Sequence, residues 1–133
     1  MEVRGGIVVA STGCPSACVV DSVSFQVSTA AGGDPIPLDP AATNNRTVIA
    51  YRDKAVVSND MTYTVTWITG NSDTLLEPGE LATITITATA NANTIEDLAA
   101  NDRWTLEVQT PVGAVVDITR SLPAQLATVM QLH

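Results

Sequence analysis

The strongest constraint on the fold is a turn signal that leads directly into a run of alternating residues. The turn spans Leu76–Glu80 and reads LEPGE, and the run spans Leu81–Ala88 and reads LATITITA. Proline presets the φ angle of such a turn and glycine accepts a positive φ, so we expect Glu80 to stand in solvent at the strand entrance. In the run, apolar residues and threonines alternate with a period of two. This pattern predicts a half-buried antiparallel strand whose outer face is coated with threonine.

Length and composition fit a single small domain with an aliphatic core. The chain has 133 residues, of which 45% are hydrophobic and only 4% aromatic, so Val, Ile, Leu and Ala must fill most of the core. Its net charge of −8 repels nucleic acid and anionic lipid, so we expect no nucleic-acid partner. It lacks an apolar run of about 18 residues, and its first residues lack the basic and apolar regions of a signal peptide. We therefore expect no membrane contact.

Alternation with a period of two recurs along the chain. Strands are expected at residues 6–10, 18–29, 46–52, 61–67, 81–90, 104–108 and 116–120, with a last segment that ends in Val129, Met130 and Leu132. The residues of the second strand expected to face the core are Val19, Val23, Phe25 and Val27. Residues 30–40 are rich in proline and glycine and should have no regular structure, and residues 93–100 should hold at most one helical turn. Seven or eight short strands spaced by about ten residues predict an all-β fold, an immunoglobulin-like antiparallel β-sandwich, as one domain over residues 1–133.

The two cysteines, Cys14 and Cys18, are four positions apart. In an extended strand they would lie ~13 Å from each other, too far for a disulfide, whereas a turn over residues 15–17 would bring them within reach. Two interpretations stay open: a disulfide, which suits an oxidising extracellular setting, and two free thiols in a loop. A zinc site is not expected, because such a site takes four ligands and His133 is the single histidine.

Two groups of acidic side chains are candidates for Ca²⁺, a cation that binds several oxygen atoms. The first group is Asp73, Glu77 and Glu80, and the second is Glu96, Asp97, Asn101 and Asp102. Neither follows the sequence pattern of a calcium loop, so the preferred interpretation is that these carboxylates are solvated and that the chain has no metal site.

Few residues suit catalysis. The chain has no internal histidine for general-base work and no Gly-x-Ser-x-Gly motif, and its glycine pairs lack the lysine of a phosphate loop. Each of Trp67 and Trp104 lies on the apolar face of an alternating strand, so core packing is preferred to a carbohydrate platform. The same holds for Tyr51 and Tyr63, whose hydroxyls then need hydrogen-bond partners. We expect that the chain is not an enzyme.

Several blocks of the sequence resemble archaellins, the archaeal flagellins. The LEPGE turn and its Thr/Ile strand are similar to a motif in the middle of the archaellin β-domain. Trp104–Ala114 and Ile118–Pro123 are similar to the C-terminal hairpin of that family, and Val3–Val9 is similar to the exit from its N-terminal helix. The resemblance covers most of the chain and is weakest between residues 32 and 60.

The resemblance implies a structural role. Archaellins carry a long hydrophobic N-terminal helix that packs in the filament core, while a β-sandwich faces outward and contacts its neighbours. That helix is missing here, so we expect the C-terminal outer domain alone, with residues 1–6 as the remnant of the helix exit or an artificial start. The implied function is that of an extracellular subunit of the archaellum, the archaeal swimming filament. Its implied partners are further copies and other archaellins, joined in a helical filament through the missing helix.

The family also bears on modification. Archaellins are commonly N-glycosylated, which makes Asn45, in the sequon Asn45-Arg46-Thr47, a glycosylation candidate. An unmodified loop asparagine is the alternative. No cofactor is expected, with Ca²⁺ at Asp73, Glu77 and Glu80 as the exception to test. The alternative function is that of an extracellular immunoglobulin-like binding or adhesion module of a cell-surface protein.

Overall fold

The computed structural model describes residues 2–13, 18–29, 35–39, 41, 46–54, 56–70, 74–88, 91, 98–111 and 115–132. These residues form eleven strands, eight of which have four or more residues. The longer strands are β1 (Glu2–Thr12), β2 (Val19–Ser28), β4 (Val48–Asp53), β6 (Thr64–Thr69), β8 (Leu81–Thr87), β9 (Arg103–Gln109), β10 (Val115–Ser121) and β11 (Val129–Leu132). The two-residue strands are β3 (Ile36–Pro37), β5 (Val57–Ser58) and β7 (Leu75–Leu76).

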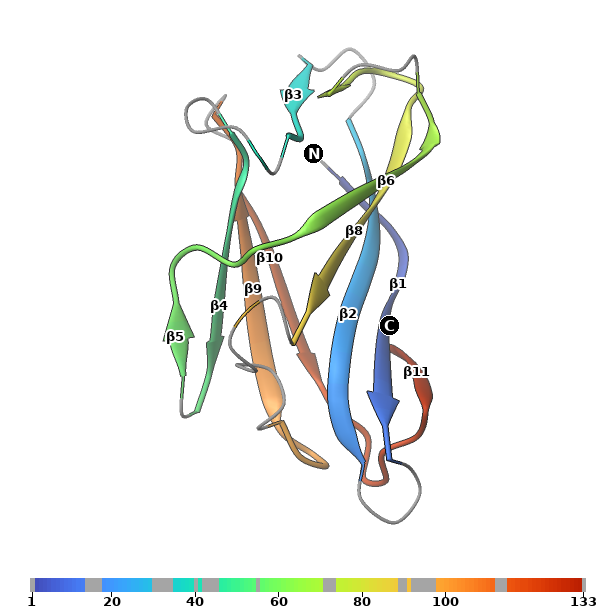
Figure 1. Cartoon of the computed structure of the whole chain (residues 1–133), viewed down its shortest axis with the longest axis vertical. Coiled ribbons are helices and arrows are strands. Elements are labelled where there is room, and N and C mark those ends of the chain that lie inside the picture. Colours follow the sequence, from blue (N-terminus) through green and yellow to red (C-terminus); the bar gives the residue numbers. More distant parts are fainter. Residues whose placement is uncertain are drawn as a thin grey trace.

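The strands build two facing sheets and one small pair, and their pairings are antiparallel. One sheet has the order β11-β1-β2-β8-β6, the other has the order β10-β9-β4-β5, and β3 pairs with β7. Figure 1 shows the five-stranded sheet on the right and the four-stranded sheet on the left, with β3 at the upper end. The predicted antiparallel β-sandwich is confirmed, and its eight longer strands agree with the expected seven or eight.

The core lies between the two sheets and is mainly aliphatic. In β8 the alternation places Ile84 and Ile86 inward, at 0% and 1% exposure, while the threonines between them face outward. In β9 the buried residues are Trp104, Leu106 and Val108. Full burial of a large apolar side chain contributes about 1.5–3 kcal/mol, so the inward rows of these strands dominate the stability of the fold.

One predicted core residue is placed wrongly by strict alternation. Val19 is 37% exposed, whereas its neighbour Val20 is fully buried. The ladder between β1 and β2 pairs Ala10 with Ser22 and then Ser11 with Val20, so that Asp21 is an extra residue in β2. This β-bulge shifts the alternation by one position, so that Val20 faces the core.

The expectation that residues 30–40 have no regular structure is also wrong in part. Ile36 and Pro37 form β3, which pairs with Leu75 and Leu76 of β7. Pro37 has no N–H to donate, but the next residue, Leu38, donates its N–H to the carbonyl of Thr74 at 2.8 Å. Burial of Ile36, Leu38 and Leu76 adds apolar contacts that turn propensities do not reveal. The helical turn expected at residues 93–100 falls largely outside the described residues.

Candidate functional site

The LEPGE turn has the geometry that its sequence predicts. Gly79 has a φ of +88°, and the Glu80 N–H donates to the Glu77 carbonyl at 3.0 Å. With proline before the glycine, this is a type II turn. The expected solvent position of Glu80 is wrong: its residue is only 9% exposed. Its carboxylate turns back over the turn and accepts the N–H of Glu77 at 2.8 Å instead of facing water.

The turn contains two of the three residues of the first candidate calcium group. It brings Glu77 and Glu80 together, but Asp73 lies outside the described residues. Within the described part of the chain no three acidic, cysteine or histidine side chains gather around a common point. Calcium binding at this turn therefore stays a prediction.

In the second candidate calcium group, the two described residues, Asn101 and Asp102, make hydrogen bonds within the fold. Asp102 accepts hydrogen bonds from the Lys54 ammonium and from the N–H of Ala99, both at 2.9 Å. The bond from Lys54, and then the bond from Ala99, lowers the pKa of Asp102. Asn101 adopts a φ of +65° and donates its N–H to Pro123, which completes the turn before β9. Glu96 and Asp97 lie outside the described residues.

Of the predicted disulfide and glycosylation residues, the structure describes Cys18. Cys18 is disulfide-bonded, and its Sγ lies 3.5 Å from the carbonyl oxygen of Leu126. A disulfide sulfur has no hydrogen, so this is a contact and not a hydrogen bond. The expected partner, Cys14, and the sequon residue Asn45 both lie outside the described residues, so their bridge and glycan stay predictions.

The aromatic residues pack as expected. Trp104 is 1% exposed, and Trp67 is half-buried against the same core. The Tyr51 hydroxyl donates to Asp53 Oδ2 at 2.6 Å. The Tyr63 hydroxyl donates to the Thr47 carbonyl at 2.7 Å, and burial raises its pKa.

The outer face of the five-stranded sheet carries hydroxyl and amide groups in rows. One row crosses four strands through Arg4, Gln26, Thr83 and Thr66. The next row crosses five strands through Gln131, Val8, Ser24, Thr85 and Thr64. Within these two rows Arg4 is the one charged residue. Such a face can hydrogen-bond to another surface over a wide area.

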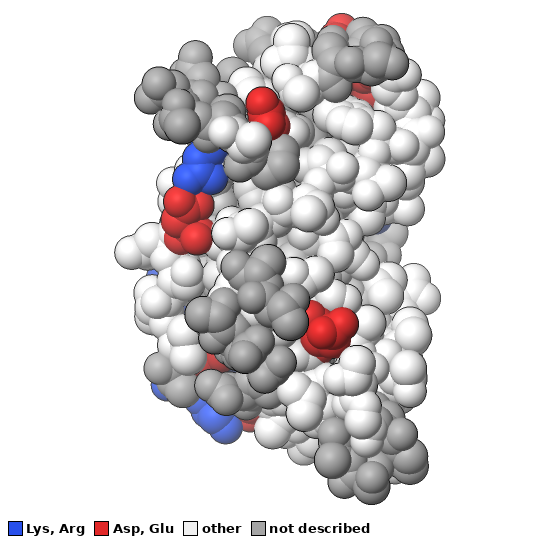
Figure 2. Space-filling model, in the orientation of Figure 1, with Lys and Arg blue, Asp and Glu red and all other residues white. Residues whose placement is uncertain are grey.

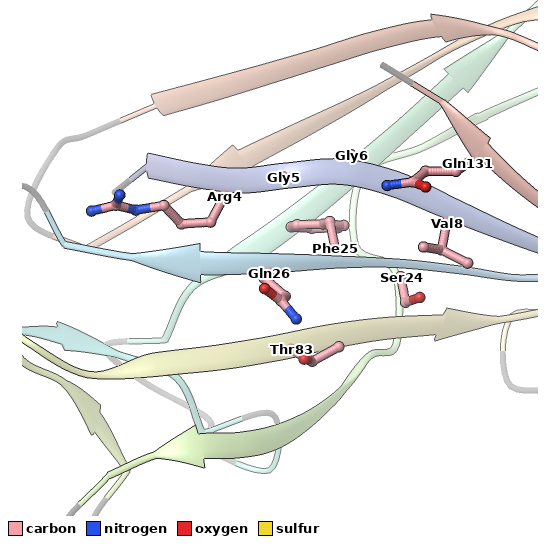
Figure 3. Close-up of a pocket in the computed structure, with 9 residues that line it drawn as sticks. All are labelled: Arg4, Gly5, Gly6, Val8, Ser24, Phe25, Gln26, Thr83 and Gln131. Atoms are coloured by element: carbon pink, nitrogen blue, oxygen red, sulfur yellow. The ribbon is translucent and has the colours of Figure 1, made fainter.

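A shallow groove crosses this face where β1 is irregular. Arg4 pairs with Gln26 and Val8 pairs with Ser24, so three residues of β1 lie opposite one residue of β2. Gly5 has a φ of +71°, which favours glycine, and a Cβ on Gly6 would lie 3.0 Å from Gln131 Cγ. The groove has a volume of about 210 Å³. Figure 3 shows Arg4 at one end of it, Gln131 at the other, and Gln26 of β2 on the side toward β8. We call it the Arg4 groove.

The outer face of the four-stranded sheet is different in chemistry. Glu107 of β9 lies directly opposite Asp117 of β10. Glu107 pairs with Arg52 at 3.2 Å and accepts a hydrogen bond from Gln109, while Asp117 is exposed and makes no ion pair with any described residue. Figure 2 shows that most of the surface in its view is uncharged, and that basic and acidic groups adjoin along the left edge, where Figure 1 places β4 and β5.

Sequence reasoning missed the Arg4 groove and the Glu107–Asp117 pair. From the sequence we rejected a phosphate loop at Gly5 and Gly6 and placed them in the segment that resembles a helix exit, but we did not consider that glycine within a strand is a signal of a bulge. The acid pair has no sequence signal, because it depends on which residues of β9 and β10 lie opposite each other. Among the described residues no helix has the length and hydropathy needed to cross a membrane.

Comparison with known proteins agrees with the predicted resemblance. Residues 5–120 match the family model of archaeal-type flagellin. A curated relative, probable flagellin 2 of Archaeoglobus fulgidus, is 31% identical over 110 residues, which cover 78% of this chain. The chain spans about half of that relative, 53% of its length.

Two solved structures share the fold. Flagellin FlaB1 of Methanocaldococcus jannaschii has a TM-score of 0.75 and 14% identity, with 98% of this chain and 95% of that chain covered. A chain of the archaeal flagellum of Methanospirillum hungatei has a TM-score of 0.70 and 20% identity, with 98% and 68% covered. At such identities the structures establish the fold, and the sequence matches establish the kinship. Since the family model covers most of its length, this chain belongs to the archaeal-type flagellin family.

Proposed function

We propose that this chain is the outward-facing domain of a structural subunit of the archaellum filament, where it packs against neighbouring copies. The observation that carries the proposal is the flagellin match over residues 5–120. Because the chain spans about half of its curated relative, the proposal includes a second part of the protein, an N-terminal hydrophobic helix that holds the filament core.

The chemistry of the two outer faces supports a packing role. One face presents hydroxyls and amides, and the other presents charged side chains. Broad polar faces of this kind suit contacts between subunits in water, as polar rims do in other interfaces. We propose that the chain acts in the extracellular space as one structural domain, without catalysis or a cofactor, and that Cys14 and Cys18 form a bridge there.

The test is to place the gene that encodes this chain in a flagellated archaeal host whose own flagellin genes are deleted. Antibody against the 133-residue chain, coupled to gold, is then applied to whole cells and viewed by electron microscopy. We expect gold along the entire length of the restored filaments. Uniform labelling of the cell envelope, with bare or absent filaments, would instead support the binding or adhesion module.

A further inference from the structure

We propose that neighbouring copies of this chain meet head to tail through an ion pair, in which Arg4 of one copy binds Asp117 of the next. The inference rests on the proposed function, because it names the contact by which the outer domains pack. Four observations carry it: the exposure of Arg4, the uncharged side chains that line the groove beside it, the lack of a cation for Asp117 among the described residues, and the placement of the two on different sheets.

The Arg4 guanidinium is held in place by one hydrogen bond, and its terminal nitrogens can still donate to a further carboxylate. Its Nε donates to Ser28 Oγ at 2.8 Å, which fixes the side chain along β2. Its terminal nitrogen lies 3.6 Å from a carboxylate oxygen of Glu2, and both side chains are more than half exposed. An exposed pair at that distance contributes little and can be replaced, whereas two parallel bonds from a guanidinium to a carboxylate are strong.

The walls of the Arg4 groove favour an incoming carboxylate. Besides Arg4, its polar side chains are Gln26, Gln131, Ser24 and Thr83, which are uncharged and can donate hydrogen bonds. Figure 3 shows Gln26 and Gln131 on either side of the glycine pair. Acidic groups lie outside this lining: Glu2 is 3.6 Å from Arg4, and Glu80 shares the adjoining pocket with it. On a protein with a net charge of −8, a groove lined by a cation and by no carboxylate offers an acidic group of another copy attraction from Arg4 and hydrogen-bond donors along its walls.

Asp117 is a carboxylate that a cation from another copy would stabilise. It lies directly opposite Glu107, and like charges in that position destabilise a sheet. Arg52 and Gln109 already engage Glu107. Asp117 is exposed on β10, an edge strand of its sheet, and within the described residues it has no cation of its own. The fold thus holds two adjacent carboxylates, of which Glu107 alone is paired with an arginine, Arg52 of β4 on the far side of β9. A second arginine, bound to Asp117, would relieve the repulsion.

The geometry makes the contact intermolecular. Arg4 faces outward from the five-stranded sheet, and Asp117, next to the buried Ile118, faces outward from the four-stranded sheet. One copy therefore cannot bring the two together. A contact between two different patches is heterologous, so it leaves each patch free on one end of the chain of subunits and can propagate into a filament.

Charge reversal tests the pair in the filaments described above. We expect Arg4→Glu and Asp117→Arg each to shorten or abolish filaments, and the double variant R4E/D117R to restore most of their length. Arg103→Glu, at an exposed position on β9, changes the net charge by the same amount and sign as Arg4→Glu; it is the control for that variant and should leave filaments intact. Since Asp117→Arg removes the repulsion from Glu107, the isolated D117R chain should melt at or above the wild-type temperature while filaments are lost.

A zero-length cross-link identifies the contact directly. Arg4→Lys keeps the charge and adds an amine that a carbodiimide joins only to a touching carboxylate. In filaments of mixed ¹⁴N and ¹⁵N subunits, mass spectrometry should find position 4 joined to Asp117 or Glu107 of another copy, and Arg103→Lys should give no such product.

The possible failures are distinct. If wild-type protein forms no filaments, the proposed function fails. A product that joins position 4 to Glu2 of the same copy is expected in any case, because the two side chains are 3.6 Å apart. If filaments form but the double variant is no better than the worse single variant, or if the products between copies join position 4 only to other carboxylates, the ion pair is wrong and the filament role stands.

Discussion

The buried carboxylate of Glu80 offers the sharpest test of the fold. We predict that Glu80→Ala destabilises the domain, because it removes the acceptor for the Glu77 N–H, which lies 2.8 Å from Glu80 Oε1. A hydrogen bond to a charged group contributes about 1.5–3 kcal/mol to stability. For a domain of this size, that loss lowers the melting temperature by about 5–15 °C. Urea unfolding followed by tryptophan fluorescence measures the free energy, and calorimetry measures the melting temperature.

Two further variants separate the effect of the Glu80 charge from that of its contacts. Glu80→Gln keeps an oxygen acceptor without the charge and should cost less than Glu80→Ala. Gly70→Ala probes the same carboxylate from its other side, because a Cβ there would lie 3.3 Å from Glu80 Oε2 and 3.2 Å from Trp67 Cε3. When Glu80 is already alanine, the first of these contacts is gone, so Gly70→Ala should cost less in that background.

A small loss of stability in Glu80→Ala would refute the role given to the Glu80 carboxylate. If Glu80→Ala changes the free energy of unfolding by less than about 0.5 kcal/mol, as is usual for surface sites, the carboxylate is solvated after all. The turn would then owe its stability to proline and glycine alone, as the sequence suggests. Additive effects of Gly70→Ala and Glu80→Ala would lead to the same conclusion.

Four other predictions follow from the sequence and the structure. Lys54 and a backbone N–H lower the pKa of Asp102 in the folded state. Its carboxylate therefore stabilises the fold at pH values above its unfolded pKa, and this contribution is lost as the pH falls through the folded pKa. In urea unfolding from pH 7 to pH 2, the free energy of unfolding of Asp102→Asn should depend less on acid than that of the wild type. Thiol titration of the unfolded, unreduced chain should find no reactive thiol if Cys14 and Cys18 are bridged, and two reactive thiols would exclude the bridge. The intact mass of protein from native filaments should exceed the sequence mass by a glycan that Asn45→Gln removes; an unmodified mass rejects that site. Since each copy carries a net charge of −8, filaments should dissociate more readily at low ionic strength, where long-range repulsion is least screened, and dissociation that is independent of salt would contradict this.

Much of the fold follows from the period of the sequence. The strand at Leu81–Thr87 was predictable because alternation alone decides which side chains face the core. The exposed position of Val19 was not predictable, because the bulge at Asp21 depends on how β2 pairs with β1. The β3–β7 pair was not predictable either, since a strand of two residues has no period to detect.

The surface features follow less directly. An arginine and an aspartate are visible in any sequence, but period two fixes only the face of a strand and not its partner. That Asp117 lies opposite Glu107, and that Arg4 lies on a different sheet, follows from strand order, which is set by long-range contacts. The buried Glu80 shows the same limit, because a charged residue next to a turn is usually in water.

The pairing of β11 with β1 has a consequence for which strand forms the edge of the sheet. Ile7 pairs with Leu132 and Ala10 with Val129, so β11 lies outside β1 at one end of the five-stranded sheet. A long strand at an edge presents a row of unpaired N–H and C=O groups with which other chains can pair. Here the four residues of β11 take that place beside Ile7–Ala10, instead of the middle of the eleven-residue strand β1. The short strand leaves fewer unpaired backbone groups at this edge and so disfavours edge-to-edge aggregation of the domain.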